Sequence, residues 1–267
     1  MNFITLSYFD LVLASGLLFV CGGLSMALKL GLERQIAVAA LRTLVQLLLI
    51  GLVLKALFAA VSPWLTALAA LVMALAAGRE VVARQKRRFT GLWTYGLGTT
   101  NLIFAGGVVT IFSLTALIQA DPWYDPRYSL PLLGMILGNT MTGIAVGLDR
   151  LVSAAVSERS AIESRLALGQ DRTLVFRPLV RDASRAGLIH IINAMAAAGL
   201  ISLPGMMTGQ ILAGVEPVEA VKYQVMILFL IAGATGIGTL GAVLAGAWRL
   251  TDDHHRLRLD HLQGADR

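Results

Sequence analysis

Long runs of apolar residues alternate with short polar segments along almost the whole chain. Seven runs can be marked, at residues 8–28, 36–58, 64–82, 94–118, 130–148, 187–211 and 218–248. Each run is about 20 residues long, enough for a helix to cross roughly 30 Å of hydrocarbon. The pattern predicts an all-α, polytopic membrane protein with about seven transmembrane helices.

The composition supports a membrane protein. Of the 267 residues, 57% are hydrophobic and 14% are charged, with a mean hydropathy of +0.74, whereas soluble domains carry about 25% charged residues. We therefore expect a transmembrane domain over residues 1–250, containing one long cytoplasmic segment at 149–185. A cytoplasmic tail at 251–267 is expected to be solvated.

The net charge of +6 could indicate binding to nucleic acid, so the positions of the basic residues decide its meaning. Of the 22 Lys and Arg residues, 18 lie on one side of the predicted spans, in segments 29–34, 79–88, 150–185 and 249–267. The positive-inside rule places that side in the cytoplasm. We therefore expect the N-terminus outside and the C-terminus in the cytoplasm, and no nucleic-acid partner.

The cytoplasmic segment contains a partly apolar helical pattern. Residues 157–168 alternate charged positions with Ala161, Ile162, Leu166 and Leu168, and Gly169 is a typical residue to end a helix. This predicts a short amphipathic helix at the cytoplasmic surface. A second helical pattern resumes near Leu174 and is expected to run into span six.

Glycines spaced four apart predict close helix contacts, because helices in lipid associate through small residues. Three such pairs occur in spans five and six, Gly134 with Gly138, Gly143 with Gly147, and Gly205 with Gly209. They could serve packing within the chain or the interface of a homodimer.

Polar residues inside the predicted spans are candidates for a transport path. Arg42 and Gln46 share one face of span two and could either anchor that helix or line a path. Pro204 and Gly205 predict a helix break, which in transporters often forms a substrate site. The candidate path consists of Arg42, Gln46, Asn139, Asn193, Pro204, Gly205, Met206, Met207 and Gln210.

Several side chains could bind a metal ion, but they do not form a recognisable set of ligands. The thioethers of Met206 and Met207 suit soft metals, although methionine in an apolar helix more often fills space. His190 could bind a proton or a metal, or only form a local hydrogen bond. The tail carries His254, His255 and His261 among aspartates without the spacing of a known site. Any metal ligands therefore stay unknown.

Nucleotide-binding and hydrolase motifs are absent from the sequence. No G-x-x-x-x-G-K-[ST], H-E-x-x-H or G-x-S-x-G occurs. We expect no enzyme activity and no cofactor bound by this chain, so that any ATP chemistry belongs to a partner.

Several stretches together resemble a known family. RDASRA at 181–186, GLISLPGMMTGQILAG at 199–214 and PVEAVKYQ at 217–224 are similar to the FetB family of ABC-transporter permeases, as are RTLVQL at 42–47 and GMILGN at 134–139. Family members carry Pro-Thr-x-Asp at the start of span six, where this chain has HIIN at 190–193. An acidic group is therefore missing at that position.

The resemblance implies a permease subunit in the bacterial inner membrane, acting as a homodimer with a separate FetA-like ATPase that binds ATP and magnesium. The FetB family is associated with iron export, and its plant relatives are associated with aluminium tolerance and UDP-glucose transport. Glu163 and Gly169 resemble the E-A-A-x-x-x-G loop by which such permeases contact their ATPase. The expected coupling residues are Glu163, Leu166, Leu168 and Gly169.

Three hypotheses follow for the function. The first is export of iron or a related metal ion with energy from the ATPase, or transport of another substrate such as a nucleotide sugar by the same machinery. The second is a membrane scaffold that recruits a soluble partner through residues 149–185. The third is a channel or carrier that needs no ATP.

Overall fold

The computed structural model describes residues 7–85, 87–252 and 254–263. They divide into two compact units, residues 1–60 and 61–267, which are described separately. Helices dominate both units, and the described residues contain only isolated β-bridges and no named strand. The predicted all-α class is confirmed.

The first unit is a helical hairpin of α1 (Tyr8–Ala27) and α2 (Glu33–Ala60). Ser7 caps α1 by a reciprocal pair of hydrogen bonds with Asp10, which satisfies two backbone donors at the helix start. In the turn, Ser25 Oγ accepts from Leu32 N at 3.0 Å and donates to Glu33 Oε1 at 3.2 Å. Nearly all other described side chains of this hairpin are exposed, as expected for helices surrounded by lipid or by another subunit.

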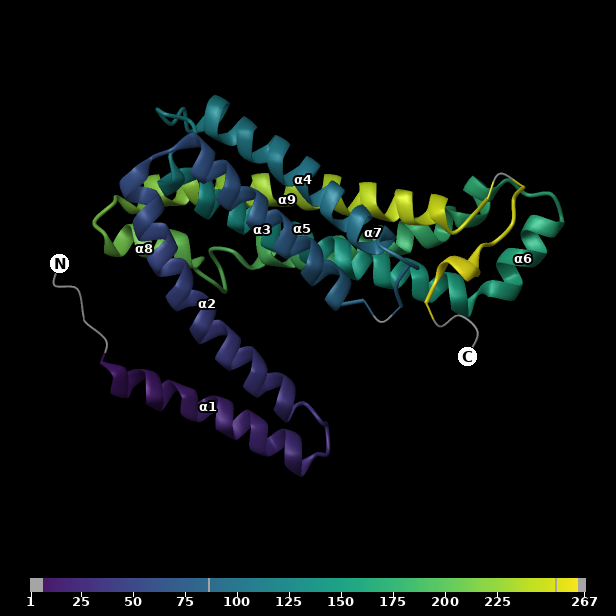
Figure 1. Cartoon of the computed structure of the whole chain (residues 1–267), viewed down its shortest axis with the longest axis horizontal. Coiled ribbons are helices and arrows are strands. Elements are labelled where there is room, and N and C mark those ends of the chain that lie inside the picture. The colour runs from purple at the N-terminus through teal and green to yellow at the C-terminus, as the bar shows by residue number, and fades with distance from the viewer. Residues whose placement is uncertain (1–6, 86, 253, 264–267) are drawn as a thin grey trace. The chain divides into compact units, whose positions relative to one another are not determined.

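The second unit is a bundle whose long helices lie side by side (Figure 1). It contains α3 (Pro63–Ala83), α4 (Trp93–Phe112) with the π-helical turn η1 (Ser113–Leu117), α5 (Pro126–Ser157), α7 (Arg172–Ala197) and α9 (Pro217–Arg249). The short helix α6 (Arg159–Ala167) and the C-terminal segment lie at one end of this bundle, and α8 (Gly205–Leu212) lies at the other.

Six helical segments are long and apolar enough to cross a membrane: Phe9–Ala27, Glu33–Ala60, Pro63–Ala83, Trp93–Leu117, Pro126–Ser157 and Pro217–Arg249. They agree with six of the seven predicted spans. The predicted orientation of the termini stays a prediction.

Span six differs from the single helix expected at 187–211. Helix α7 begins at Arg172 and carries four further charges up to Arg185. Only its last 12 residues, 186–197, are free of Asp, Glu, Lys and Arg, and they extend over roughly 18 Å at 1.5 Å per residue. The apolar sequence then continues through residues 198–204 into the separate helix α8. A complete crossing here therefore requires both helices and the connection between them.

Helices α5, α7 and α9 cross at close range, and at this crossing two backbones meet directly. A Cβ placed on Gly187 of α7 would lie 2.6 Å from Gly143 O of α5 and 2.6 Å from Thr239 Cγ2 of α9. One on Gly147 would lie 2.9 Å from Val243 Cγ2. The predicted contact through Gly143 and Gly147 is confirmed, whereas Gly138, Gly205 and Gly209 have no neighbour within 4 Å at that position.

The crossing predicts a sharp difference between two glycine substitutions. Gly187→Ala forces a methyl group against the backbone of α5 and should reduce stability by about 1–3 kcal/mol, as overpacking does. Gly138→Ala, in open space on α5, should leave stability unchanged or raise it slightly, because alanine favours helix. Thermal unfolding of both variants in detergent measures this, and a Gly187→Ala midpoint equal to wild type would disprove the tight contact.

Candidate transport path and coupling surface

Helix α6 is joined to α7 by a tight turn at residues 168–171. Gly169 has φ +83°, a conformation that glycine adopts without strain, and its N–H donates to Leu166 O at 3.0 Å. Asp171 then caps α7 by accepting from Thr173 N at 2.7 Å. The Thr173 hydroxyl and, after it, the Thr173 backbone N–H lower the pKa of the Asp171 carboxyl, which keeps the cap ionised. The predicted amphipathic helix and its end at Gly169 are confirmed.

One face of α6 belongs to the core of the chain. Ile162 and Leu166 are 2% and 9% exposed and pack in one cluster with Val175 and Phe176 of α7. Leu166 was expected to contact the ATPase. Its side chain fills the chain's own interior in this structure, and the expected contact stays a prediction. Sequence periodicity shows that a helix has an apolar face but not which partner covers it.

The other face of α6 is open. Leu168 is 82% exposed at the turn, and Glu163 accepts from Arg159 Nε at 2.8 Å on the helix surface. An exposed ion pair of this kind contributes little stability. Among the predicted coupling residues, Glu163, Leu168 and Gly169 are therefore exposed and available to a partner.

The described part of the C-terminal segment packs against the bundle, whereas a solvated tail was expected. Leu259 and Leu262 are buried in the same cluster as Leu166, and Thr90 N donates to His261 O at 2.7 Å. Arg258 donates to Asp260 at 2.7 Å and lowers the pKa of that carboxyl to about 2. Two leucines thus hold a charged segment against the bundle. The charged composition of this segment gave no sign of that packing. Residues 253 and 264–267 of the tail lie outside the described residues.

The histidines do not gather into a metal site. His261 Nδ1 lies 3.0 Å from Arg249 O, and His255 Nδ1 lies 3.4 Å from Arg172 N. Within residues 7–85, 87–252 and 254–263, no three His, Cys, Asp or Glu side chains come close enough to hold a metal ion. His190 Nδ1 lies 3.1 Å from Gly187 O, and its buried Nε2 has no hydrogen-bond partner there.

The candidate path residues lie on helices α2, α5, α7 and α8 and at the N-cap of α8. Asn139 donates to Met135 O of its own helix at 2.8 Å, and Asn193 is exposed. Gln210 has a buried oxygen without a partner, and Met206 is 38% exposed. Arg42 and Gln46 lie in the first unit, on the exposed surface of α2.

The predicted helix break is wider than a single proline. Helix α7 ends at Ala197, Gly199 has φ +82°, and Pro204 is the N-cap of α8. The connection is closed by hydrogen bonds from Gly199 N to Ser202 O and from Ser202 N to Ala197 O, at 2.9 and 3.2 Å. Leu200 and Ile201 are 89% and 88% exposed, so this apolar connection presents its side chains outward.

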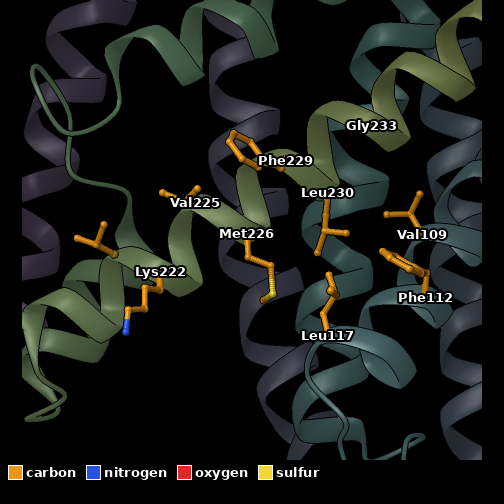
Figure 2. A pocket seen from close by; sticks show the side chains of 10 residues that line it. Val109, Phe112, Leu117, Lys222, Val225, Met226, Phe229, Leu230 and Gly233 are labelled. Carbon is orange, nitrogen blue, oxygen red and sulfur yellow. The ribbon is translucent and has the colours of Figure 1, made fainter.

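An apolar groove of about 690 Å³ lies between α4 and α9, where sequence analysis placed no site (Figure 2). Val109, Phe112 and Leu117 form one wall, and Met226 and Leu230 line the α9 side. Lys222 at its edge points away from these side chains and pairs with Glu219 at 2.6 Å. The groove suits an apolar chain rather than a hydrated ion. The apolar residues that line this groove come from distant segments of the chain, so no pattern in the sequence predicts it.

Comparison with known proteins settles the family. The model of the "Uncharacterised protein family (UPF0014)" matches residues 8–250. The chain belongs to the UPF0014 family. It is 36% identical over 257 residues to the UPF0014 membrane protein slr1647 of Synechocystis, covering 95% of this chain and 96% of that one. No solved structure matches the chain.

Two further UPF0014 relatives extend the comparison. The chain is 31% identical over 254 residues to the probable iron export permease protein FetB of Escherichia coli, covering 95% of this chain and 96% of that one. It is 32% identical over 248 residues to the UPF0014 membrane protein STAR2 of rice, covering 90% and 85%. The resemblance to the FetB family is confirmed. The chain is a multi-pass protein of a permease-type membrane family, in agreement with the predicted bacterial inner membrane.

Because Leu166 is buried and Leu168 is exposed, substituting these two leucines should change the free energy of unfolding by very different amounts. Leu166→Ala should reduce the free energy of unfolding by about 2–5 kcal/mol, because it leaves a cavity in the core. Leu168→Ala, at an exposed position, should change it by less than about 0.5 kcal/mol. Chemical or thermal unfolding of the purified full chain gives both values. Equal effects of the two substitutions would show that α6 does not pack as described.

Proposed function

We propose that this chain is the permease subunit of an ABC transporter that exports iron or a related metal ion. A separate FetA-like ATPase subunit hydrolyses ATP, and two copies of the permease act with two ATPase subunits. The observation that carries the proposal is the similarity to the probable iron export permease FetB of Escherichia coli along almost the full length of both chains. The missing nucleotide-binding motif supports an ATPase on another chain.

The exposed edge of α6 is the proposed contact with the ATPase. Leu168 and Gly169 are exposed in the turn after α6, and Glu163 is exposed on α6 itself. A leucine exposed to 82% in water gains about 25 cal/mol per Å² when a partner groove covers it. This assignment moves the main contact from Leu166 to Leu168.

The packing of α6 supports a mechanical role for α7. Ile162 and Leu166 lock α6 against Phe176, so a pull on the exposed edge of α6 acts on the start of α7. The same helix ends at the break before α8 and crosses α5 at Gly187. Nucleotide-driven closure of the ATPases would therefore shift α7 about this crossing and rearrange the connection at 198–204, which is how alternating access would arise.

The test is transport by inside-out vesicles that contain the permease and its purified ATPase. ATP should drive accumulation of iron and not of a nucleotide sugar. Leu168→Asp should abolish transport and weaken ATPase association more than tenfold, because an unpaired charge then faces the buried contact. The matched control Ser160→Asp adds the same charge to an exposed position of α6 and should retain most association.

Two results would contradict parts of the proposal separately. ATP-dependent accumulation of a nucleotide sugar without iron would overturn the substrate. Co-purification of the ATPase with Leu168→Asp at the wild-type level, with ATP hydrolysis still stimulated, would place the coupling surface elsewhere. Iron flux without ATP or ATPase would favour a channel or carrier.

A further inference from the structure

A second large pocket, of about 720 Å³, lies where α3 ends and α4 begins. Its walls come from the last turns of α3, the connection at 84–92, the first turn of α4 and Gln263 of the C-terminal segment. Since α3 and α4 are membrane-spanning helices by length and composition, their ends mark the level of the lipid headgroups. The pocket therefore sits at the interface between hydrocarbon and water.

Two arginines contribute to the lining of this pocket. Arg79 of α3 and Arg88 of the connection both line it, together with Tyr95. No carboxylate pairs with either guanidinium in the part of the chain that the structure describes, although other surface arginines such as Arg150 and Arg256 do form ion pairs. Guanidinium groups bind phosphate through paired N–H donors. Two of them together favour an anionic group.

The lining also contains exposed apolar side chains. Val72, Leu75 and Leu92 line it, and each is substantially exposed, Leu92 to 81%. These residues continue the apolar outer surface of α3, where Leu68 and Leu71 are exposed as well. A soluble phosphate would leave this wall in water, while an acyl chain lying along α3 would cover it.

The backbone at Arg88 is held in place by the rest of the fold. Phe89, next to Arg88, is 1% exposed, and its N–H donates to Thr94 Oγ1 at 2.8 Å. Gln263 N donates to Arg88 O at 2.8 Å, and Phe89 forms a β-bridge with Leu262. The backbone that carries Arg88 is thus fixed before any ligand arrives, which reduces the entropy lost on binding.

We propose that this pocket binds one anionic phospholipid, with its phosphate between Arg79 and Arg88 and an acyl chain along Val72, Leu75 and Leu92. The charge of the two arginines selects the headgroup, and the continuity of the apolar wall with the exposed apolar surface of α3 selects a lipid over a soluble anion. The bound lipid joins α3 to the connection on which the C-terminal segment is docked. It therefore stabilises the end of the bundle that carries α6, whatever the transported substrate is.

The experiment is thermal unfolding of the delipidated full chain in a neutral detergent with added lipid. Dioleoyl phosphatidylglycerol should raise the unfolding midpoint by about 5 °C, the shift expected for a ligand near 100 times its Kd on a chain of this size. Dioleoyl phosphatidylcholine and glycerol phosphate should each raise it by less than about 1 °C. The comparison with phosphatidylcholine tests whether the headgroup must be anionic. The comparison with glycerol phosphate tests whether the ligand must be a lipid and not a free phosphate.

Matched variants locate the effect. Arg79→Gln combined with Arg88→Gln should remove the shift, and Arg87→Gln, which neutralises a neighbouring arginine outside the pocket, should retain it. Arg79→Lys with Arg88→Lys keeps the charge and should retain at least half of the shift. If the double glutamine variant does not fold, the test uses this lysine variant and the two single glutamine variants. Each single glutamine variant should then show a reduced shift.

Three results would overturn the proposal. One is an equal shift with phosphatidylcholine, and another is an equal shift with glycerol phosphate alone. The third is a full phosphatidylglycerol shift in the double glutamine variant. If that third result came with weakened binding of the ATPase, the two arginines would serve an acidic surface of the protein partner instead.

Discussion

The close approach of α5 and α7 at Gly143 and Gly187, with Thr239 of α9 against both, is the contact on which the bundle depends. Water does not drive helices together in lipid, so dispersion contacts must hold them and the backbones must come near. A side chain at either glycine would separate α5 from α7. The larger residues above and below, such as Ile144 and Val243, are fully buried because the backbones meet there.

Helix α7 connects this crossing to both ends of the bundle. Its first turns pack against Ile162 and Leu166 of α6, and its last turn leads into the connection before α8. A helix transmits displacement along its axis because its backbone hydrogen bonds resist stretching. The element that carries the proposed coupling surface is therefore physically continuous with the element that borders the proposed path. The apolar core around Leu259 and Leu262 adds the C-terminal segment to the same end.

Features governed by local sequence were predictable, and those governed by contacts between distant segments were not. Span boundaries could be predicted because about 20 apolar residues have few other uses, and Gly169 ended α6 as its conformational freedom suggested. Ile162 and Leu166 share one face of α6 by their spacing, yet only Val175, Phe176 and their neighbours determine that this face packs inside the chain. Leu259 and Leu262 lie among charged residues, and their docking depends on Phe89, far away in sequence. The residues of the candidate path could be named from the sequence, but how they lie relative to one another on several helices could not be predicted.

The central claim is that the α6 end of the bundle faces the cytoplasm and the α8 end faces outward. Labelling of single cysteines with a membrane-impermeant maleimide tests this directly, in spheroplasts, after Cys21→Ser has removed the one native cysteine. Leu168→Cys and Glu216→Cys place exposed thiols at the two ends. The account predicts that the cysteine at 216 reacts in intact spheroplasts and that the one at 168 reacts only after permeabilisation. Labelling at 168 from outside would contradict the orientation and with it the proposed coupling surface.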